Sequence, residues 1–498
     1  MGLEFETVIG LEVHVQLATR SKLFCPCSTD YIGAEPNSNV CPLCLGLPGT
    51  LPSLNRKAID LGLRAALALK CSINRKTRFH RKNYFYPDLP KAFQISQYDV
   101  PLAVSGSMPI TIDGRVKNIG ITRLHLEEDA GKLVHSTSDG RLSGAMFSLV
   151  DYNRSGVPLA EIVSEPELSS SEEAREYVIS LRRLVRYLGV SDGDMESGSL
   201  RVDANVSQKC SDGRWGNRVE IKNLNSLKAL ERALEFEISR QRDLLGKGVE
   251  IIQETRHWDD GAGVTRSSRG KEEAHDYRYF PEPDLPAIRI QSAEVDRMAG
   301  ALPELPWEKR ERYAKEWGLN LPDASSLSDN PDVAEFFEKT VASGAEPLLA
   351  ANWIRTEILR LVNENEVKVL DLSVKPEHLS ALLNKVRGGD LSNTAAKDVL
   401  GVMAKEGIGL SDAMKKAGVR EGGFSTDALE EVVRAILEAN PSEADLVLGK
   451  KDPGDKKRKF LTGLVMREIR GQASPDAVAA AFEGILESRE DMGNAHSH

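Results

Sequence analysis

The chain has 498 residues, and at roughly 150 residues per domain this length predicts about three domains, each able to bury its own core. Lys and Arg number 65 against 75 Asp and Glu, which gives a formal net charge of −10. This balance excludes a histone-like or polybasic protein, so any contact with nucleic acid must come from a local basic patch.

The sequence shows no membrane segment and no secretion signal. No stretch approaches the ~20 consecutive apolar residues that span a bilayer, and the first six residues have neither a cationic start nor an apolar core. We therefore expect a cytoplasmic protein that does not bind membranes.

The first clear element is a strand over residues 7–16. Val13 and Val15 share one face of this strand, while Glu12 and His14 share the other. One face should therefore join the core, and the other should carry polar chemistry. A second alternating run, over residues 197–205, has polar side chains on one face that suit a ligand cleft, although a solvated sheet face gives the same pattern.

Two helices are expected in the same half of the chain. Capping-box spacing at residues 169–173 precedes apolar positions that repeat at three and four until Gly189. A second helix should run from about Leu227 to Gln241. Its first backbone N–H groups would lie beside Lys222, where an anion could bind.

The second half of the chain consists almost entirely of helical patterns. Gly, Asn and Pro residues separate six expected helices, at about 331–342, 346–363, 376–387, 392–406, 426–440 and 475–488. The contrast with residues 1–290 predicts a mixed α+β region followed by a helical region.

Four of the six cysteines fall within twenty positions. Cys25 and Cys27 form one close pair, and Cys41 and Cys44 form another. Four thiolates satisfy a tetrahedral Zn²⁺ and leave no open position, so a zinc ion held here would be structural. The alternative is four unrelated buried thiols.

A second group of candidate ligands consists of carboxylates and histidines. Its members are Glu12 and His14 in the first strand, His125 followed by Glu127, Glu128 and Asp129, and Glu161 with Glu165. Carboxylates favour Mg²⁺, but acidic residues on a solvated strand face are an alternative that sequence distance alone does not exclude.

Two basic segments could contact nucleic acid. Residues 78–87 interleave cations with aromatics, a composition that can hold a phosphate and stack a base, or that can form a buried aromatic strand. Residues 447–472 carry a local net charge of +5, counted from eight Lys or Arg against three Asp or Glu. Gly449, Pro453 and Gly454 suggest that this basic cluster lies at a loop tip.

Seven sequence strings together resemble one known family. They are ETVIGLEVH (6–14), RKNYFYPD (81–88), HLEEDAGK (125–132), EIVSEP (161–166), GSLRVDAN (198–205), KNLNS (222–226) and DYRYFPEPD (276–284). In this order they are similar to the B subunits of the tRNA-dependent amidotransferases, which make Gln-tRNA or Asn-tRNA indirectly. The resemblance covers nearly the whole chain.

The resemblance implies an α+β cradle domain followed by an all-helical domain and a helical tail domain. We place the cradle, a kinase and transamidase domain with the zinc-binding loop, at residues 1–292. The helical domain would span 293–408, and the tail that binds tRNA would span 409–490.

Site residues are also implied by the resemblance. Mg²⁺ would be held by Glu12, His14, Glu128 and Glu161, which would act in catalysis. We expect the phosphates and the tRNA 3′ end to be bound by other residues of the matching strings, namely Lys82, Tyr84, Arg201, Asp203, Asn205, Lys222, Asn223, Asn225 and Arg278. In the tail, we expect tRNA to contact Lys456, Lys457, Arg458 and Lys459.

The family's chemistry is that of a carbon–nitrogen ligase. ATP would phosphorylate the side-chain carboxylate of Glu-tRNA(Gln) or Asp-tRNA(Asn), and ammonia would then displace phosphate to give the amide. The chain shows no amidase motif that would release ammonia from glutamine. It should therefore need an amidase subunit, and by family analogy it should also need a small third subunit, in a heterotrimer.

Two other functions fit parts of the sequence. A zinc-containing RNA-binding protein without activity would account for the cysteines and the basic segments. A hydrolase with Zn²⁺ at Glu12 and His14 is the third alternative, which the excess of carboxylates over imidazoles disfavours.

Overall fold

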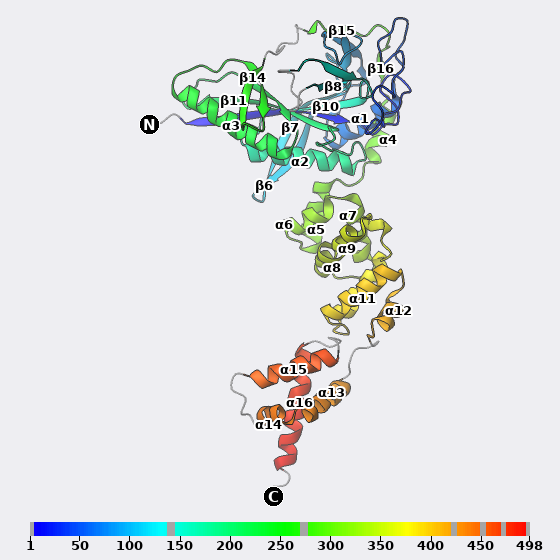
Figure 1. Cartoon of the computed structure of the whole chain (residues 1–498), viewed down its shortest axis with the longest axis vertical. Helices are drawn as coiled ribbons and strands as arrows, with labels where there is room; N and C mark the ends of the chain where they lie inside the picture. The colour runs from blue at the N-terminus through cyan, green and yellow to red at the C-terminus, as the bar shows by residue number, and fades with distance from the viewer. Residues whose placement is uncertain are drawn as a thin grey trace. The chain divides into compact units, whose positions relative to one another are not determined.

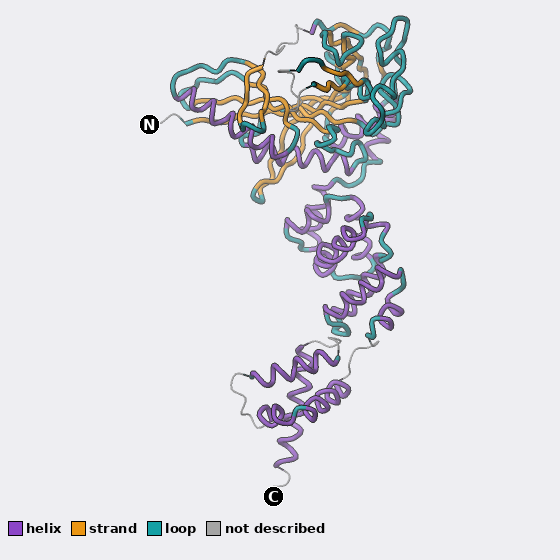
Figure 2. Tube along the Cα trace, viewed as in Figure 1, coloured by secondary structure: helices purple, strands orange, loops and turns teal. Residues whose placement is uncertain are grey.

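The computed structural model describes residues 4–136, 145–268, 277–419, 426–448, 455–469 and 475–494. The chain divides into two compact units, Met1–Pro306 and Trp307–His498. Within the described ranges, the strands all lie in the first unit and the second unit is helical (Figures 1 and 2). The predicted order of a mixed region followed by a helical region is therefore confirmed.

A twelve-stranded sheet forms the centre of the first unit. Its main path runs β14-β13-β12-β11-β1-β10-β7-β5-β4-β15, with β6 beside β7 and β2 beside β6. The strands of this sheet are β1 (Phe5–Gln16), β2 (Ser72–Ile73), β4 (Phe79–Asn83), β5 (Phe93–Gln97), β6 (Ala103–Ile112), β7 (Arg115–Glu128), β10 (Pro158–Ser164), β11 (Leu200–Cys210), β12 (Val219–Leu224), β13 (Glu254–Asp259), β14 (Val264–Ser268) and β15 (Phe280–Pro281).

Two short antiparallel pairs accompany the sheet. β3 (Lys76–Thr77) pairs with β16 (Ile288–Arg289), and β8 (Lys132–His135) pairs with β9 (Ser148–Asp151). β16 follows β15 closely in the sequence, so the chain returns to the region of β3 and β4 just before the first unit ends.

Three helices cover one face of the sheet (Figure 1). They are α1 (Arg56–Ala68), α2 (Ser171–Tyr187) and α3 (Leu227–Gly246), and a fourth helix, α4 (Ser292–Gly300), contacts α1. The side chains of Asn55, Ser170 and Ser226 accept hydrogen bonds from backbone N–H groups in the first turns of α1, α2 and α3. These N-caps satisfy donors that would otherwise lack partners.

The core lies between these helices and the apolar face of the sheet. Along β1, Ile9, Leu11 and Val13 are fully buried, and the residues between them are half-buried. Side chains alternate between the two faces of a strand, so the face opposite the helices carries Glu12 and His14. The predicted division of this strand into a core face and a polar face is confirmed.

The described residues of the second unit form two apolar clusters. The first draws residues from Tyr313 to Val419 and the second from Leu429 to Ile485. The helices are α5 (Pro306–Trp317), α6 (Leu321–Ser328), α7 (Pro331–Ala342), α8 (Pro347–Trp353), α9 (Leu359–Asn365), α10 (Pro376–Arg387), α11 (Asn393–Glu406), α12 (Leu410–Lys416), α13 (Thr426–Ala439), α14 (Pro441–Leu448), α15 (Lys456–Glu468) and α16 (Pro475–Asn494), with a 3₁₀ turn at Val369–Asp371.

Most of the predicted helices are present. The helix expected over 346–363 consists of α8, one π-helical turn (Ile354–Ile358) and α9. Of the basic cluster for which a loop tip was expected, Lys456–Lys459 form the first turn of α15 instead. Lys450, Lys451, Arg470 and the Gly and Pro residues that suggested the loop lie outside the described residues. Within the described ranges, no helix combines the length and apolarity that a membrane crossing requires.

Candidate metal- and phosphate-binding site

The polar residues of the site come from one row across the sheet. In the antiparallel register, His14 of β1 pairs with Arg201 of β11 on one side and with Glu161 of β10 on the other, and Glu161 pairs with His125 of β7. Cross-strand partners point to the same face of a sheet. These side chains therefore gather on the face opposite the helices.

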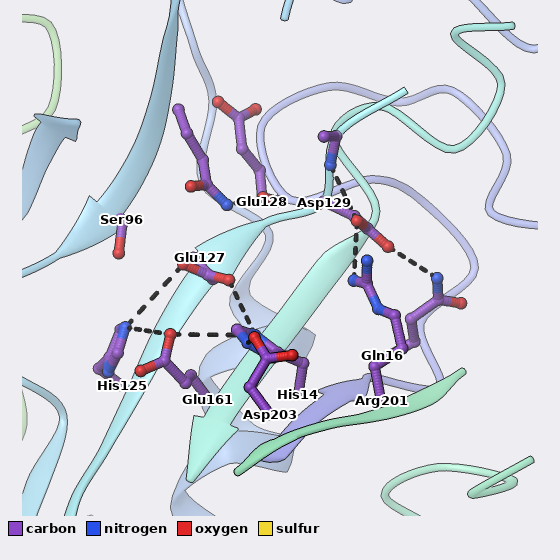
Figure 3. Close-up of polar contacts among 12 residues, drawn as sticks. His14, Gln16, Ser96, His125, Glu127, Glu128, Asp129, Glu161, Arg201 and Asp203 are labelled. Atoms are coloured by element: carbon purple, nitrogen blue, oxygen red, sulfur yellow. Dashed lines mark hydrogen bonds and ion pairs between the residues drawn. The ribbon is translucent and has the colours of Figure 1, made fainter. Parts of the chain in front are cut away.

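His14, Glu127 and Glu161 form a compact group in the middle of this face (Figure 3). The Nδ1 atom of His14 lies 3.2 Å from Glu127 Oε1 and 3.8 Å from Glu161 Oε2. One ligand-type atom from each residue lies within 4.8 Å of those of the other two. His125 Nε2 lies 3.4 Å from Glu161 Oε2 on the outer side of the group.

The charges in this group are strongly coupled. Burial by itself would lower the pKa of His14, but its contacts with Glu127 and Glu161 outweigh burial and raise this pKa to about 9. Burial would raise the pKa of Glu127, but His14 and Lys82 lower it well below its usual range. Both carboxylates that face His14 are therefore ionised, since the pKa of Glu161 is also lowered by His125 and His14 against its burial.

The group has the composition of a divalent-cation site. The Nδ1 atom of His14 is buried and makes no hydrogen bond of good geometry, although it lies between two carboxylates. Carboxylate oxygens are the ligands that Mg²⁺ prefers, and a neutral imidazole nitrogen adds a borderline ligand. Within the described residues, the side chains present fit one hard divalent ion.

A cavity of about 400 Å³ opens beside this group. Its size falls in the range typical of sites for small molecules. It is lined by Glu12, His14, Lys82, Ser96, Gln97, Tyr98, Arg123, His125, Glu161, Asp203, Asn205, Arg218, Glu220, Lys222, Gln253, Glu254, Thr255, Tyr277 and Tyr279.

Seven of the sequence-predicted site residues line this cavity: Glu12, His14, Lys82, Glu161, Asp203, Asn205 and Lys222. Lys222 Nζ lies 2.8 Å from Asp203 Oδ2 and 2.7 Å from Glu220 Oε1, so its charge is balanced within the protein. Burial would lower the pKa of Lys82, but Tyr279 and Glu127 outweigh burial and raise it. Lys82 therefore presents a permanent positive charge near the carboxylate group.

Glu128, one of the predicted Mg²⁺ ligands, is not part of this group. The Glu128 carboxylate lies 2.5 Å from Lys91 Nζ and accepts a hydrogen bond from the backbone N–H of Ile95. Adjacent residues of a strand point to opposite faces. His125 and Glu127 therefore share the polar face of β7, and Glu128 points to the other face.

Arg201 lies beside the cavity but does not line it. Its guanidinium donates a hydrogen bond of 2.8 Å to Asp129 Oδ1, and Gln16 donates one of 2.9 Å to the other carboxylate oxygen (Figure 3). The charge of Arg201 is therefore used to hold a buried aspartate.

Four other predicted residues have structural contacts outside the cavity lining. The amide nitrogen of Asn223 donates to the carbonyl of Trp258, and that of Asn225 donates to Asn223 Oδ1. Arg278 is exposed, and its backbone has a positive φ of 46°. The Tyr84 ring packs edge-on against that of Tyr277.

Three tyrosines of the site were not predicted from the sequence, and Glu127 was a candidate ligand that the final Mg²⁺ set left out. Strand alternation favours Glu127 over Glu128, because Glu127 is two residues from His125 and shares its face of β7. Tyr98, Tyr277 and Tyr279 form one wall of the cavity, and their approach depends on the pairing of β15 with β4. The two-residue strand β15 leaves no periodic pattern that would predict this pairing.

The four clustered cysteines meet in the loop between β1 and α1. The Sγ atom of Cys44 lies 3.4 Å from that of Cys25 and 3.7 Å from those of Cys27 and Cys41. Four thiolates around a tetrahedral Zn²⁺, each about 2.3 Å from it, would stand about 3.8 Å apart. The arrangement therefore fits a structural zinc ion.

A buried lysine accompanies the cysteines. Lys22 is fully buried, and its Nζ atom lies 3.6 Å from Cys44 Sγ. A hydrogen bond from Cys25, with a further contribution from the charge of Lys22, lowers the pKa of Cys44 to about 4 against its burial. Cys44 is therefore a thiolate, the form that binds metal.

Two protein-family models match the chain. The GatB/GatE catalytic domain matches residues 7–296, and the GatB domain matches residues 335–486. The chain is 48% identical over 478 residues to the B subunit of the aspartyl/glutamyl-tRNA(Asn/Gln) amidotransferase of Carboxydothermus hydrogenoformans, a match that covers 95% of this chain and 97% of that protein. The chain belongs to the family of amidotransferase B subunits.

Other relatives with the same name match over a similar length. The protein from Thermoanaerobacter pseudethanolicus is 46% identical over 474 residues, covering 95% of this chain and 97% of the relative. The protein from Crocosphaera subtropica is 45% identical over 491 residues, covering 97% and 98%. The family resemblance seen in the sequence is confirmed. The match to the catalytic-domain model spans the strands that carry His14, Glu127 and Glu161, which we call the metal-type group.

Replacing Glu127 and Glu128 with Gln, one at a time, tests which of these two glutamates belongs to the metal-binding group. We expect Glu127→Gln to weaken Mn²⁺ binding at least about tenfold, because the group loses a charged ligand. Glu128→Gln should keep Mn²⁺ binding and lower the thermal unfolding midpoint, because Lys91 loses its buried partner. Calorimetric titration with Mn²⁺ measures the first effect, and equal weakening in both variants would contradict this placement.

Metal analysis of the purified chain tests the cysteine site. We expect about one zinc ion per chain, and we expect Cys44→Ser to remove it, because zinc would lose one of four thiolates. Cys71→Ser is the matched control, since Cys71 is also buried but lies outside the cluster. Full zinc content in the Cys44 variant would show that the zinc does not depend on this cluster, and zinc-free wild-type protein would favour four thiols that are structural without metal.

Proposed function

We propose that this chain catalyses the ATP-dependent activation of the side-chain carboxylate of Glu-tRNA(Gln), Asp-tRNA(Asn) or both, and its amidation to Gln-tRNA(Gln) or Asn-tRNA(Asn). The observation that carries this proposal is that His14, Glu127 and Glu161 meet beside a cavity that Lys82 also lines. The names of the relatives, which are tRNA-dependent amidotransferase subunits, supply the substrate class.

The need for ATP follows from the chemistry of the carboxylate. Ammonia cannot displace oxide from a carboxylate at neutral pH, so an oxygen must first become a better leaving group. Attack of a carboxylate oxygen on the γ-phosphorus of ATP forms a carbon–oxygen–phosphorus link and releases ADP. Ammonia then forms the carbon–nitrogen bond, phosphate leaves, and the surplus proton passes to solvent.

The residues of the cavity have distinct tasks in this proposal. His14, Glu127 and Glu161, with Glu12 beside them, would hold Mg²⁺, which when bound neutralises phosphate oxygens and aligns the in-line attack. Lys82, which lies close enough to Glu127 and Glu161 for both to stabilise its charge, would attract the phosphate chain. Lys222 is already paired with Asp203 and Glu220, so it would hold those acidic residues in place.

The source of ammonia requires a partner. The chain would act in a heterotrimer with two other proteins, an amidase that hydrolyses glutamine and a small third subunit. Support for such partners comes from the relatives, which are themselves named as subunits. The finer domain plan, with a cradle at 1–292, a helical domain at 293–408 and a tail at 409–490, belongs to the same proposal.

We also propose that the helical tail binds tRNA through the first turn of α15. Lys456, Lys457, Arg458 and Lys459 lie there in succession, and no acidic residue occupies this turn. The N-terminus of a helix attracts anions, so the helix and the cations would act together on a phosphate backbone. The separate apolar cluster over residues 429–485 would give this surface a scaffold of its own.

ATP turnover by the assembled complex tests the proposed activity. We expect ADP formation by the chain with its co-expressed partners to require Mg²⁺ and to rise when mischarged Glu-tRNA or Asp-tRNA is added. Lys82→Met should lower this rate by about 100-fold, the effect of losing a charge that stabilises a transition state. Lys57→Met, on the exposed face of α1, should leave it unchanged.

The same assay distinguishes the rival functions. Tight tRNA binding with no ATP turnover on either substrate would favour an RNA-binding protein without activity. Turnover that persists after Mg²⁺ is removed would favour the zinc hydrolase.

The tail surface is tested by the salt dependence of tRNA binding. Neutralising all four residues at the start of α15 should weaken binding and flatten the plot of log affinity against log salt, because fewer counterions are released. The matched control neutralises four other cations of the second unit, Lys397, Lys405, Lys415 and Lys416. An unchanged slope in the α15 variant would leave this surface without a role in binding.

A further inference from the structure

Three tyrosines, Tyr98, Tyr277 and Tyr279, form an aromatic wall in the lining of the cavity. Every other lining side chain is charged or carries an amide, hydroxyl or imidazole. The cavity thus combines flat rings of low polarity with strongly charged groups. A nucleotide has the same two parts, a flat base and a chain of phosphates.

Two of the tyrosines are stacked on each other, and two further rings pack edge-on against them. The rings of Tyr98 and Tyr279 are parallel within 5°, with centroids 4.1 Å apart. Tyr277 braces Tyr279 edge-on at 6.1 Å, and His80 braces Tyr98 at 5.9 Å. Tyr98 lines the cavity and remains 46% exposed, so its side chain is accessible to a ligand there.

The backbone that carries Tyr277 and Tyr279 is held firmly. The side chain of Asn83 donates hydrogen bonds to the carbonyls of Tyr277 and Arg278, at 3.3 and 2.7 Å. The positive φ of Arg278 is a conformation that side chains with a Cβ rarely adopt. Its cost in conformational energy is offset by these bonds, which keep the two flanking tyrosines in the wall.

A second anchor lies just beyond Tyr279. Arg81 of β4 binds Glu282 through two hydrogen bonds of 2.7 and 2.9 Å, and its guanidinium lies 4.3 Å from the ring centroid of Phe93. Together with the pairing of β15 and β4, this bidentate pair fixes the segment on the sheet. A rigid aromatic surface loses little entropy when a ligand binds.

Lys82 joins the aromatic wall to the charged side. Its Nζ atom lies 4.9 Å from the centroid of Tyr277, and it lies close enough to Glu127 and Glu161 for both to stabilise its charge. The ammonium is therefore near both the tyrosines and the carboxylates, where it can meet a ligand that contacts both. Phosphates would be the part of the ligand that meets it.

We propose that the outer face of Tyr98, backed by Tyr279, is a platform on which an adenine ring stacks. This inference rests on the proposed function, which offers two sources of that ring, ATP and the 3′-terminal adenosine of the aminoacyl-tRNA. Stacking of a base on an aromatic side chain needs no hydrogen bond from the base edge. The shared chemistry is therefore a flat purine next to a phosphate chain.

Binding measurements on the assembled complex test the platform and identify the source. The first arm compares adenylyl imidodiphosphate, a non-hydrolysable ATP analogue, with inorganic tripolyphosphate, which has no base. The second arm compares one tRNA with a complete 3′ end and the same tRNA without its terminal adenosine. Each ligand is titrated against the wild type, Tyr98→Ala, Tyr98→Phe and the control Phe85→Ala, an exposed aromatic outside the cavity lining.

If the platform holds ATP, Tyr98→Ala weakens binding of the analogue by about five- to 160-fold, the range for losing one base stack, and leaves tripolyphosphate binding unchanged. If it holds the tRNA end, Tyr98→Ala removes the affinity advantage of the complete end over the shortened one. Tyr98→Phe should match the wild type in both arms, because it keeps the ring, and so should Phe85→Ala.

Two outcomes would overturn the platform. One is wild-type binding of every ligand by Tyr98→Ala, and the other is parallel weakening of the analogue and tripolyphosphate, which would mean that the whole cavity had changed. Because this experiment measures binding and not turnover, either outcome would reject the platform without deciding on the proposed function. That function fails instead if the wild-type complex consumes no ATP with either mischarged tRNA.

Discussion

The alternation of side chains along the central antiparallel strands is the constraint on which the whole site depends. Leu11 and Val13 of β1 are buried beneath the helices, and this burial forces Glu12 and His14 to the other face. A slip of one residue in the pairing would exchange the two faces. The apolar packing that stabilises the fold therefore also sets His14 opposite Glu161.

Buried carboxylates require positive charge nearby, and two neighbouring glutamates meet this requirement differently. Glu128 is matched by Lys91, a cation fixed in the protein. Glu127, on the opposite face of the same strand, is matched by a protonated His14 and by Lys82. A bound divalent ion would take over the part of His14, since the imidazole must lose its proton to become a ligand. The positive charge beside Glu127 can therefore be exchanged for that of a bound ion, whereas the charge of Lys91 stays beside Glu128.

The sequence predicted local features better than contacts between distant segments. The strand over 7–16, the helix caps and the cysteine pairs were readable because each depends on residues close together in the chain. Choosing between Glu127 and Glu128 required only the period of a strand, yet the family resemblance pointed to Glu128, which faces away from the group. Tyr98 and Tyr279 are separated by about 180 residues, and their stacking depends on β15, which is too short to leave a pattern.

The cations at the start of α15 interact unfavourably with the helix dipole but favourably with an anionic ligand. Acidic residues stabilise the first turn of a helix and cations destabilise it; α2, with Glu172 and Glu173 in its first turn, follows this rule. In α15 four cations occupy the turn, and Asp455 at the N-cap forms no side-chain hydrogen bond. An approaching phosphate backbone reverses the sign of this interaction, because the helix and the cations then attract the same anion. Within the protein, Lys457 already pairs with Glu443 at 3.4 Å and Arg458 with Glu483 at 2.7 Å. A polyanionic partner such as tRNA would therefore add to a charge balance that these two pairs provide only in part.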